Sequence, residues 1–403
     1  YEKKREFTKS FAFRMKPDSE LKLTKNTGFH ERTSKLTRNF VDARGYWLPN
    51  DFTKHGVINE YTACREKAVL IDLSSLRKFE ILGPDAEELM DYTLTRNVKK
   101  LSVGQIVYSS MCYENGSMFD DGTLLKMSDH GFRWVCGDEY AGEWLKEQAK
   151  KKNFNVLVKN STDQINNISL QGPNSRKILE KFIFTPPTQP SISELQWFRF
   201  TICRVKELSG IPLMVSRTGY TGELGYEIWC HPSDAPAVWD VLMEAGKEEG
   251  LIPAGFGALD LLRIEAGLIL FGNEFDGQVD PFEAGVGFTV PLKTKTANFI
   301  GKEALIKRKE NPQKKLVGLE LVGKEKANHG DCVHIGRSQV GVITSGCLSP
   351  TLNKNIALCR IDVGHSEIGM NVEVGKIDGH QKRIPAKIVG FPHYDPQKTR
   401  VKS

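Results

Sequence analysis

The chain has 403 residues, 39% of them hydrophobic and 26% charged, with a formal net charge of +6 at pH 7. This composition is typical of a folded globular protein, and the length predicts two or three domains rather than one core. The mild basic charge is scattered without aromatic-rich basic runs, so we expect no nucleic-acid partner.

Residues 1 to 28 are basic and irregular, which predicts a surface extension rather than part of the core. No apolar run reaches the length of a membrane span, and the N-terminus lacks an apolar signal-peptide core. We therefore expect no membrane association. The expected compartment is the cytoplasm, or the mitochondrial matrix if the protein is eukaryotic.

Two strand-Gly-Pro-helix units lie about 90 residues apart. In the first, strands from Val69 end at Gly83-Pro84 and a helix follows over Ala86 to Leu94. In the second, a strand from Ile168 ends at Gly172-Pro173 before another helical segment. Proline just inside a helix start is a common N-terminal signal. The repeat indicates an internally duplicated α+β architecture.

Between and after these units the pattern alternates strands and helices, with a Pro-rich connection over 186–193. The predicted helices cover residues 139–150, 236–245 and 258–271, and the predicted strands cover 197–203, 213–216 and 226–230. From Lys315 onward only short strands with Gly, Asn and Pro turns remain, which predicts a separate small β-barrel domain. The predicted strands of this last domain are 316–322, 340–345, 356–361, 372–374 and 384–388.

The stretch from Ile106 to Gly122 predicts a β-hairpin, because Asn115-Gly116 suits a tight turn between two apolar strands. The second strand carries Asp120 and Asp121 side by side. Neighbouring strand residues point to opposite faces, so only one of these acids can face a given pocket. Isolated charge is costly to bury, so this pair is a candidate site, although a solvated hairpin mouth is the simpler interpretation of these residues alone.

Two further segments place polar residues where a core is expected. Arg217 to Glu227 joins two strands through several glycines, which let backbone approach a flat ligand while Tyr220 stacks on it. An ordinary Gly-rich hairpin loop is the alternative. Arg263 and Glu265 lie in an otherwise apolar helix and face different sides of it. A mid-helix acid of this kind usually pairs with a neighbouring cation.

Signatures of several common chemistries are missing. No G-x-G-x-x-G follows a strand, and Gly301-Lys302 lacks the rest of a phosphate loop. The eight cysteines are spread singly without a C-x-x-C pair, which predicts reduced thiols and no disulfide framework. His329, Cys332 and His334 lie close together, but a turn followed by an edge strand explains them, so we expect no metal site.

Taken together, the segments resemble the aminomethyltransferase (glycine cleavage T-protein) family, which includes tetrahydrofolate-dependent demethylases and the folate domains of dimethylglycine and sarcosine dehydrogenases. The matching strings are I-D-L-S (71–74), L-G-P-D-A (82–86), Y-S-S-M-C-Y-E-N-G-S-M-F-D-D (108–121), L-Q-G-P (170–173), S-R-T-G-Y-T-G-E-L-G-Y-E (216–227), R-I-E-A-G (263–267), F-G-N-E-F-D (271–276), D-P-F-E-A-G (280–285), F-I-G-K-E-A-L (299–305), V-G-V-I-T-S-G-C-L-S-P-T-L (340–352) and P-H-Y-D-P (392–396). They are collinear over about residues 30 to 400, which makes the ordered set specific.

The resemblance implies a three-domain cloverleaf around a central folate site. It divides the chain into the extension (1–28), a folate-binding region of two interleaved α+β domains (29–312) and a C-terminal β-barrel (313–403).

By motif, Asp121 falls on the acid that lies against the pterin and assists the N-5 nitrogen. Tyr108, Tyr220 and Glu227 match positions that line the folate pocket. Arg263, in the matching R-I-E-A-G helix motif, is also expected to bind the cofactor.

Three positions depart from the glycine-cleavage branch of the family. Leu259 stands where that branch has Arg, Cys136 replaces an Asn near the pterin, and Leu268 replaces a Tyr. These differences favour the demethylase or dehydrogenase-linked branches, although this chain carries no flavin domain.

The resemblance therefore implies transfer of an aminomethyl or methyl group from a donor to N-5 of tetrahydrofolate. The donor is either an aminomethyl group on a lipoyl carrier protein or a small methylated metabolite or aromatic methyl ether. A non-enzymatic alternative is a folate-binding accessory protein. Another is the folate subunit of an amine-oxidising complex with a flavoprotein partner.

Overall fold

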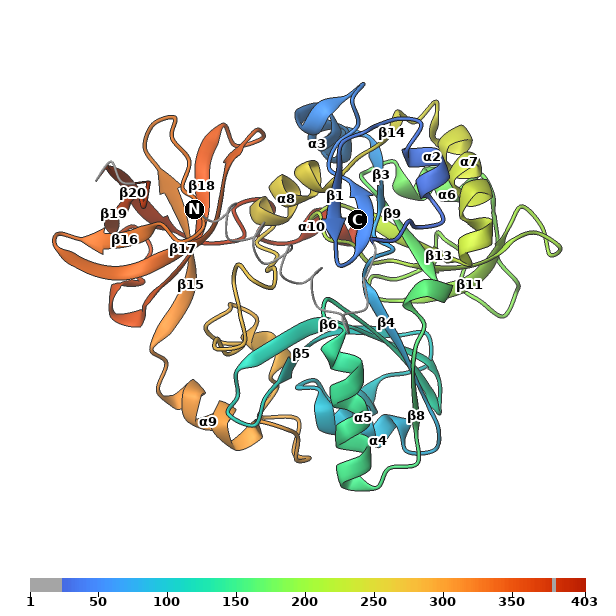
Figure 1. Ribbon diagram of the computed structural model, residues 1–403, viewed down its shortest axis with the longest axis horizontal. Helices are drawn as coiled ribbons and strands as arrows, with labels where there is room; N and C mark the ends of the chain where they lie inside the picture. Colours follow the sequence, from blue (N-terminus) through green and yellow to red (C-terminus); the bar gives the residue numbers. More distant parts are fainter. Residues whose placement is uncertain (1–23, 379–381) are drawn as a thin grey trace, which may run out of the picture.

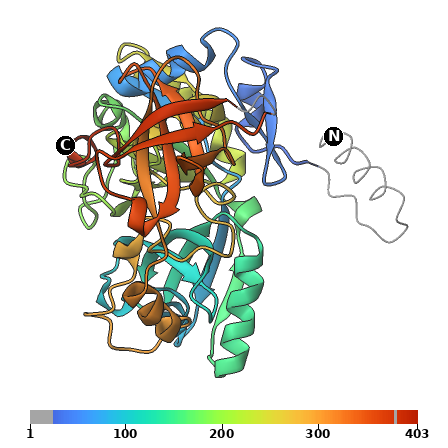
Figure 2. The ribbon, with the colours of Figure 1, turned by 90° about the vertical axis from the view of Figure 1, so that its left-hand side faces the viewer.

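A computed structural model describes residues 24–378 and 382–403 of the chain. Most of the predicted N-terminal extension, residues 1–23, lies outside the described residues. The described chain forms three parts, each built on its own sheet, and they lie side by side in Figures 1 and 2. The expected α+β cloverleaf with two interleaved domains and a C-terminal barrel is confirmed.

The first part is a seven-stranded sheet in the order β10-β11-β12-β13-β9-β3-β14. Its strands are β3 (Ala68–Asp72), β9 (Asn166–Gln171), β10 (Ile183–Phe184), β11 (Phe200–Val205), β12 (Pro212–Ser216), β13 (Gly225–Cys230) and β14 (Leu251–Pro253). One face packs on α6 (Ser175–Glu180) and α7 (Ala235–Gly246). Val69 and Ile71 on the opposite face pack with α3 (Gly56–Glu66) and α8 (Phe256–Glu265).

The second part is a five-stranded sheet in the order β5-β6-β7-β4-β8. Its strands are β4 (Arg77–Leu82), β5 (Ile106–Cys112), β6 (Met118–Ser128), β7 (Gly131–Cys136) and β8 (Leu157–Asn160). Residues of α4 (Ala86–Thr93) and α5 (Tyr140–Lys152) share the core on one face of this sheet. The predicted hairpin over 106–122 is therefore confirmed as β5 and β6, which pair antiparallel.

The two sheets are interleaved along the chain. After β3 the chain passes into the five-stranded sheet for β4 to β8, and it returns to the seven-stranded sheet at β9. Each predicted strand-Gly-Pro-helix unit belongs to a different sheet, with Gly83 at φ +136° and Gly172 at φ +126°. A side chain at either glycine would meet backbone, since the nearest carbonyl lies 2.5 Å from an added Cβ in both cases.

The face of the seven-stranded sheet opposite α6 and α7 meets the face of the five-stranded sheet opposite α4 and α5 in a shared apolar cluster. The five-stranded sheet contributes Ile106, Leu125 and Val135, and the seven-stranded sheet contributes Met214 and Trp229. Both sheets bury these faces. The polar residues on the same two faces, next to the apolar cluster, therefore lie opposite each other. This contact positions the site described below.

The third part is a closed barrel in the order β15-β18-β17-β16-β19-β20 (Figure 1). Its strands are β15 (Lys314–Leu321), β16 (Cys332–Ile335), β17 (Ser338–Ser349), β18 (Lys354–Asp362), β19 (Asn371–Gly375) and β20 (Arg383–Val389). The barrel prediction is confirmed, but the edge strand expected near Cys332 is wrong. β16 pairs with β17 on one side and β19 on the other, since barrel closure leaves no edge there.

The helix predicted over 258–271 is shorter than expected, because α8 ends at Glu265. Gly267 adopts φ +64°, and the Leu268 N–H donates to the Arg263 carbonyl as in a glycine-terminated helix end. The apolar residues that follow therefore form a loop rather than another helical turn. In the described part of the chain, no helix combines the length and apolar character needed to cross a membrane.

Candidate functional site

Asp121 lies on β6 and accepts a hydrogen bond of 2.6 Å from the hydroxyl of Tyr108 on β5. Ser110 is the direct cross-strand partner of Asp121, so Tyr108 is its diagonal neighbour on the same face. Burial raises the pKa of Asp121 to about 6, while the Tyr108 hydrogen bond and the Arg44 charge oppose that rise. The site thus holds a carboxylate that titrates near neutral pH.

Asp120 faces the other way, as the strand alternation predicts. It is 1% exposed, and its carboxylate accepts hydrogen bonds from the backbone N–H groups of Asp121, Gly137 and Asp138. Burial, followed by the Asp121 charge, raises the pKa of Asp120 to about 7. Its contacts organise the turn after β7, so Asp121 is the acid of the pair that faces the other sheet.

The seven-stranded sheet supplies Tyr220 and Glu227. The Tyr220 hydroxyl donates to the Ile269 carbonyl in the loop after α8. Glu227 on β13 accepts a hydrogen bond of 2.5 Å from Thr218. Burial raises the pKa of both groups, and the Asp121 charge contributes to the shift at Tyr220. Asp121 is therefore linked to Tyr108 by a hydrogen bond and to Tyr220 by its charge. Glu227 lies on the facing sheet.

Sequence reasoning missed Lys78, which is fully buried on β4 between the sheets. Its ammonium donates to the carbonyls of Ser74 and Leu76, and it lies 5.9 Å from the Trp229 ring centroid. Burial lowers the pKa of Lys78 to about 7, although the charges of Asp72 and Glu227 oppose this change. A single lysine in a strand gave no signal, because its burial depends on the facing sheet.

Arg44 is a second residue that the sequence analysis missed. It occupies the turn between β1 (Phe40–Ala43) and β2 (Tyr46–Pro49) with φ +56°. Its Nε donates to the Gly137 carbonyl across 3.1 Å, which brings the guanidinium near Asp121. The sequence signal available for this turn was Gly45, which adopts φ +80°.

Arg263 is 1% exposed, and its hydrogen bonds all go to protein groups. It contacts Asp260 at 2.8 Å, Glu274 at 2.9 Å and Ser345 of the barrel at 2.9 Å. Its charge also lowers the pKa of Tyr220, so the guanidinium lies near that hydroxyl. Glu265 pairs with Arg65 at 2.6 Å, as expected for a mid-helix acid.

The three departures from the glycine-cleavage branch are all buried or partly buried. The Cys136 thiol lies 3.5 Å from the Asp138 carbonyl, and it interacts more strongly with Asp120 than with Asp121. Leu259 packs in the apolar cluster between α3 and α8. Leu268 contributes its carbonyl to Arg263.

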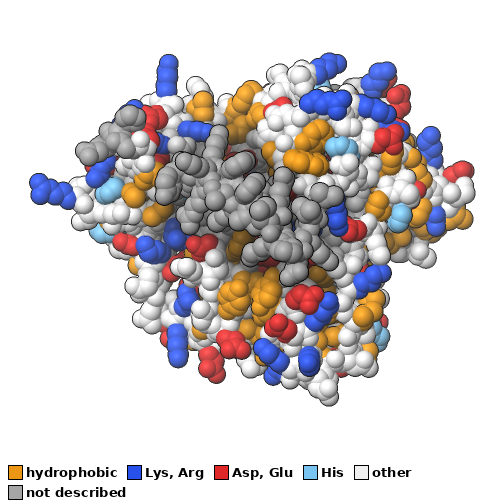
Figure 3. Space-filling model, viewed as in Figure 1, with side chains coloured by type: hydrophobic (Ala, Val, Ile, Leu, Met, Phe, Trp, Pro, Cys, Tyr) orange, Lys and Arg blue, Asp and Glu red, His pale blue; other side chains and the backbone are white. Residues whose placement is uncertain are grey.

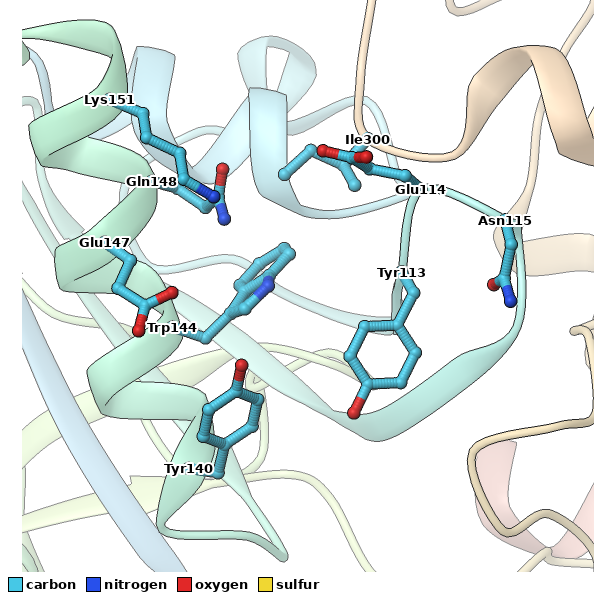
Figure 4. A pocket seen from close by; sticks show the side chains of 9 residues that line it. All are labelled: Tyr113, Glu114, Asn115, Tyr140, Trp144, Glu147, Gln148, Lys151 and Ile300. Atoms are coloured by element: carbon cyan, nitrogen blue, oxygen red, sulfur yellow. The ribbon is translucent and has the colours of Figure 1, made fainter.

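A surface pocket of about 290 Å³ lies between α5 and the turn of the β5–β6 hairpin (Figure 4). Figure 4 shows Tyr113, Tyr140 and Trp144 around it, with Glu114 and Gln148 at its rim. It contains none of the predicted site residues. On the face shown in Figure 3, basic and acidic side chains are interspersed, as the modest net charge suggests.

The eight cysteines are all free thiols, and seven of them are buried. His329 donates from Nδ1 to the Thr344 carbonyl at 2.8 Å rather than joining Cys332 and His334 in a cluster. Among the described residues, no group of three or more His, Cys, Asp or Glu side chains is arranged to hold a metal ion.

Comparison with known proteins adds to this geometry. A family model described as the GCVT N-terminal domain matches residues 29–294, and the glycine cleavage T-protein C-terminal barrel domain matches residues 314–395. The chain resembles the structure of glycine cleavage system aminomethyltransferase T from Bartonella henselae, with a TM-score of 0.82 and 25% identity over 93% of this chain and 99% of that one.

Two curated relatives match nearly all of this chain, but the chain covers different shares of their lengths. An aminomethyltransferase of Symbiobacterium thermophilum is 39% identical over 378 residues, which are 92% of this chain and 97% of that protein. Trimethylamine-oxide aldolase of Ruegeria pomeroyi is 56% identical over 403 residues, which are 100% of this chain but 51% of that protein. The chain thus spans about half the length of the aldolase. On these matches and this fold, the chain belongs to the aminomethyltransferase (glycine cleavage T-protein) family.

Proposed function

We propose that this protein binds tetrahydrofolate and transfers a one-carbon unit, at the methyl or aminomethyl level, to its N-5 nitrogen. The observation that carries this proposal is the partly buried Asp121 carboxylate, hydrogen-bonded to Tyr108 and electrostatically linked to Tyr220. Bound tetrahydrofolate would supply the nucleophilic N-5 nitrogen. Membership of an aminomethyltransferase family supports the same reaction class.

The polar groups between the sheets suit a pterin, which presents several donors and acceptors along a flat ring. Asp121 and Glu227 each accept a side-chain hydrogen bond, from Tyr108 and Thr218 respectively. Asn167 on β9 lies on the same sheet face as Glu227, and both polar atoms of its buried amide have no partner among the described residues. Unpaired buried polar atoms are costly, so a polar ligand would offset that cost.

In this proposal Asp121 is the catalytic residue. Its negative charge stabilises the positive charge that develops at N-5, or it removes the proton from that nitrogen. Tyr108 orients the carboxylate through the 2.6 Å hydrogen bond. Tyr220 and Glu227 hold the pterin from the opposite sheet. Much of the acceleration would come from holding donor and acceptor in register, since positioning alone can lower such a barrier by several kcal/mol.

We propose that Arg263 contributes to folate binding by positioning Tyr220. Its guanidinium is 1% exposed and holds Glu274 and the Leu268 carbonyl, which shape the loop that accepts the Tyr220 hydroxyl. Direct contact with folate would require displacement of one of these partners. The residue therefore acts on Tyr220 through the loop that accepts its hydroxyl.

A second candidate for the donor is a one-carbon unit released from trimethylamine N-oxide. The supporting observation is the 56% identity to a trimethylamine-oxide aldolase, compared with 39% to an aminomethyltransferase. Cleavage of trimethylamine N-oxide to dimethylamine and formaldehyde balances in atoms and electrons. Formaldehyde then gives methylene-folate with loss of water. In this version the chain captures the aldehyde that the cleavage releases.

The test is a single-turnover incubation with tetrahydrofolate and a donor panel, with the folate products resolved by mass. The panel contains an aminomethyl-lipoyl carrier protein, dimethylglycine, sarcosine, a methylated sulfonium compound, an aryl methyl ether, trimethylamine N-oxide and formaldehyde. Parallel reactions without protein and with Asp121→Asn correct for spontaneous condensation of formaldehyde.

Methylene-folate from the carrier protein supports the aminomethyl donor, and methyl-folate from a small donor supports a demethylase. Faster methylene-folate formation from formaldehyde than in either control supports the aldehyde donor. Folate binding without turnover of any donor favours the folate-binding accessory protein. An absence of folate binding overturns the proposal.

A further inference from the structure

Aromatic rings line the surface pocket between α5 and the β5–β6 turn (Figure 4). Tyr113 comes from the turn, and Tyr140 and Trp144 come from α5. All three rings contact Phe119, with centroid distances of 4.7, 5.8 and 4.9 Å. Phe119 has no cross-strand partner in the β5–β6 ladder, as expected for the extra residue of a β-bulge. Tyr113 and Tyr140 remain 37% and 42% exposed, so part of each ring is open to a ligand.

Hydrogen-bonding groups without partners surround these rings. The carboxylates of Glu114 and Glu147 form no hydrogen bond or ion pair with the described residues. Burial, followed by the charge of Glu147, raises the pKa of Tyr140, which places this carboxylate near the Tyr140 hydroxyl. The Gln148 side chain is 6% exposed and lines the pocket, yet its amide has no hydrogen-bond partner in the described part of the chain. Two free carboxylates and an unpaired amide favour a cationic ligand that donates hydrogen bonds.

Lys151 lines the pocket at the end opposite Tyr140 (Figure 4). It follows Glu147 by four residues on α5, a spacing that commonly gives an ion pair. No such pair forms, and none of the described residues gives the Lys151 ammonium an acidic partner. About 16 Å of helix rise separates Tyr140 from Lys151, so the acceptors around the rings and the lysine can bind different ends of one ligand.

The chemistry of these groups selects among cations. A quaternary ammonium ion suits an aromatic cage, but it cannot donate hydrogen bonds to free carboxylates. A guanidinium group is flat, stacks on aromatic rings and donates several hydrogen bonds, so it can bind the rings and the acceptors together. A carboxylate at the far end of the same molecule would pair with Lys151. The pocket volume of about 290 Å³ suits a small molecule.

We propose that this pocket binds a small guanidino acid. Its guanidinium group stacks on Tyr113 and Tyr140 and bonds to Glu147, while its carboxylate pairs with Lys151. The pocket lies on the α5 side of the five-stranded sheet, whereas Asp121 is on the face directed at the other sheet. The two sites are therefore separate, and this inference does not rest on the proposed function.

The experiment measures binding to the full chain by calorimetry, without folate or donor. The probes are L-arginine, L-citrulline, in which a neutral urea replaces the guanidinium, agmatine, which lacks the carboxylate, and tetramethylammonium. We expect L-arginine to bind at least about tenfold more tightly than L-citrulline, because only the guanidinium carries charge. We expect L-arginine to bind about fivefold more tightly than agmatine, because only the amino acid can pair with Lys151.

Variants of the pocket separate its two ends. Glu147→Gln and Tyr140→Leu should each lower the affinity for both L-arginine and agmatine about fivefold. Lys151→Gln should lower the affinity for L-arginine alone. Glu143→Gln and Lys150→Gln are the matched controls on the same helix outside the pocket, and they should change neither affinity. Glu147 and Lys151 are exposed, so the test does not depend on variants that disturb the core.

Three results overturn this inference. Equal binding of L-arginine and L-citrulline, or no binding of either, shows that the pocket does not recognise a guanidinium group. Tighter binding of tetramethylammonium than of agmatine makes the pocket a site for quaternary ammonium ions. Equal behaviour of the pocket variants and their matched controls places the bound L-arginine elsewhere on the surface. None of the reactions contains folate, so each result leaves the proposed function untouched.

Discussion

Tyr108 and Asp121 come from the two strands of one hairpin and share a hydrogen bond of 2.6 Å on the face directed at the other sheet. This bond stabilises the ionised form of a carboxylate that burial would otherwise keep protonated. The pair therefore controls both the orientation and the charge of the acid. Several expected outcomes depend on this relationship.

Replacing Asp121 by Asn should lower turnover much more than folate affinity. The amide keeps the size of the side chain but cannot carry the negative charge that stabilises positive charge at N-5. We expect a loss of about 100-fold or more in single-turnover rate and less than about fivefold in folate affinity. Asp129→Asn, on an exposed turn, is the control. Equal losses in rate and affinity would contradict a catalytic role.

The Tyr108→Phe variant should move the pH dependence of the rate. Asp121 acts when ionised and its pKa is about 6, so the wild-type rate should rise as the pH increases through about 6 and then level off. Tyr108 lowers this pKa through its hydrogen bond, so its removal should shift the rise to higher pH. Single-turnover rates measured from pH 5 to 9 test this, and Tyr140→Phe serves as the control. An unchanged profile would show that the hydroxyl does not tune Asp121.

The same acid should make stability fall with pH. The pKa of Asp121 is raised from 3.8 to about 6, so the folded state holds this proton more tightly than the unfolded chain. Its stabilising contribution is fully present below about pH 4 and is lost as the pH rises through about 6. Asp121→Asn does not titrate, so it should gain about 2 kcal/mol relative to the wild type between pH 4 and 7. Urea unfolding at both pH values measures this gain, and a pH-independent difference would be the contrary result.

Glu265→Gln should destabilise the junction between the barrel and the seven-stranded part. Glu265 is fully buried and binds Tyr61, Arg65 and, on the barrel strand β17, Ser349. Loss of its charge leaves buried Arg65 with Glu223 as its remaining acidic partner. We expect a loss of about 3 kcal/mol in the free energy of unfolding.

The control for that variant is Glu143→Gln, which removes an exposed pair with Lys146. It should change the free energy of unfolding by less than about 0.5 kcal/mol. Denaturant unfolding of both variants gives the comparison. Similar values for the two would mean that the buried network contributes no more than a surface pair.

Gly122→Ala should damage the strand that carries Asp121. An added Cβ would lie 2.2 Å from the Val135 carbonyl of the neighbouring strand, and backbone cannot move aside without breaking the ladder. We expect a loss of about 2 kcal/mol or more in stability together with weaker folate binding. Gly364→Ala is the matched control, because no heavy atom lies within 4 Å of its added Cβ. Thermal unfolding and folate titration of both variants decide the outcome.

Local sequence was sufficient for features that depend on neighbours in the chain. The alternation of a strand placed Asp120 and Asp121 on opposite faces, and Asn115-Gly116 identified the hairpin that carries them. The short strands after Lys315 predicted the barrel, and the two Gly-Pro units each fall in a different one of the two interleaved sheets. The sequence pattern misplaced the end of α8. The apolar pattern continued to Phe271, but the helix ends at Glu265, before Gly267 with its positive φ.

The tertiary structure decided the features that depend on two sheets meeting. Lys78 looks like an ordinary strand lysine, yet the facing sheet removes it from water and places it beside Trp229. Arg44 lies in a turn outside the motifs, yet its charge reaches Asp121 on a strand that follows more than 70 positions later. Burial and charge pairing arise from contacts between distant segments, so periodicity and spacing, which report only local geometry, cannot specify them.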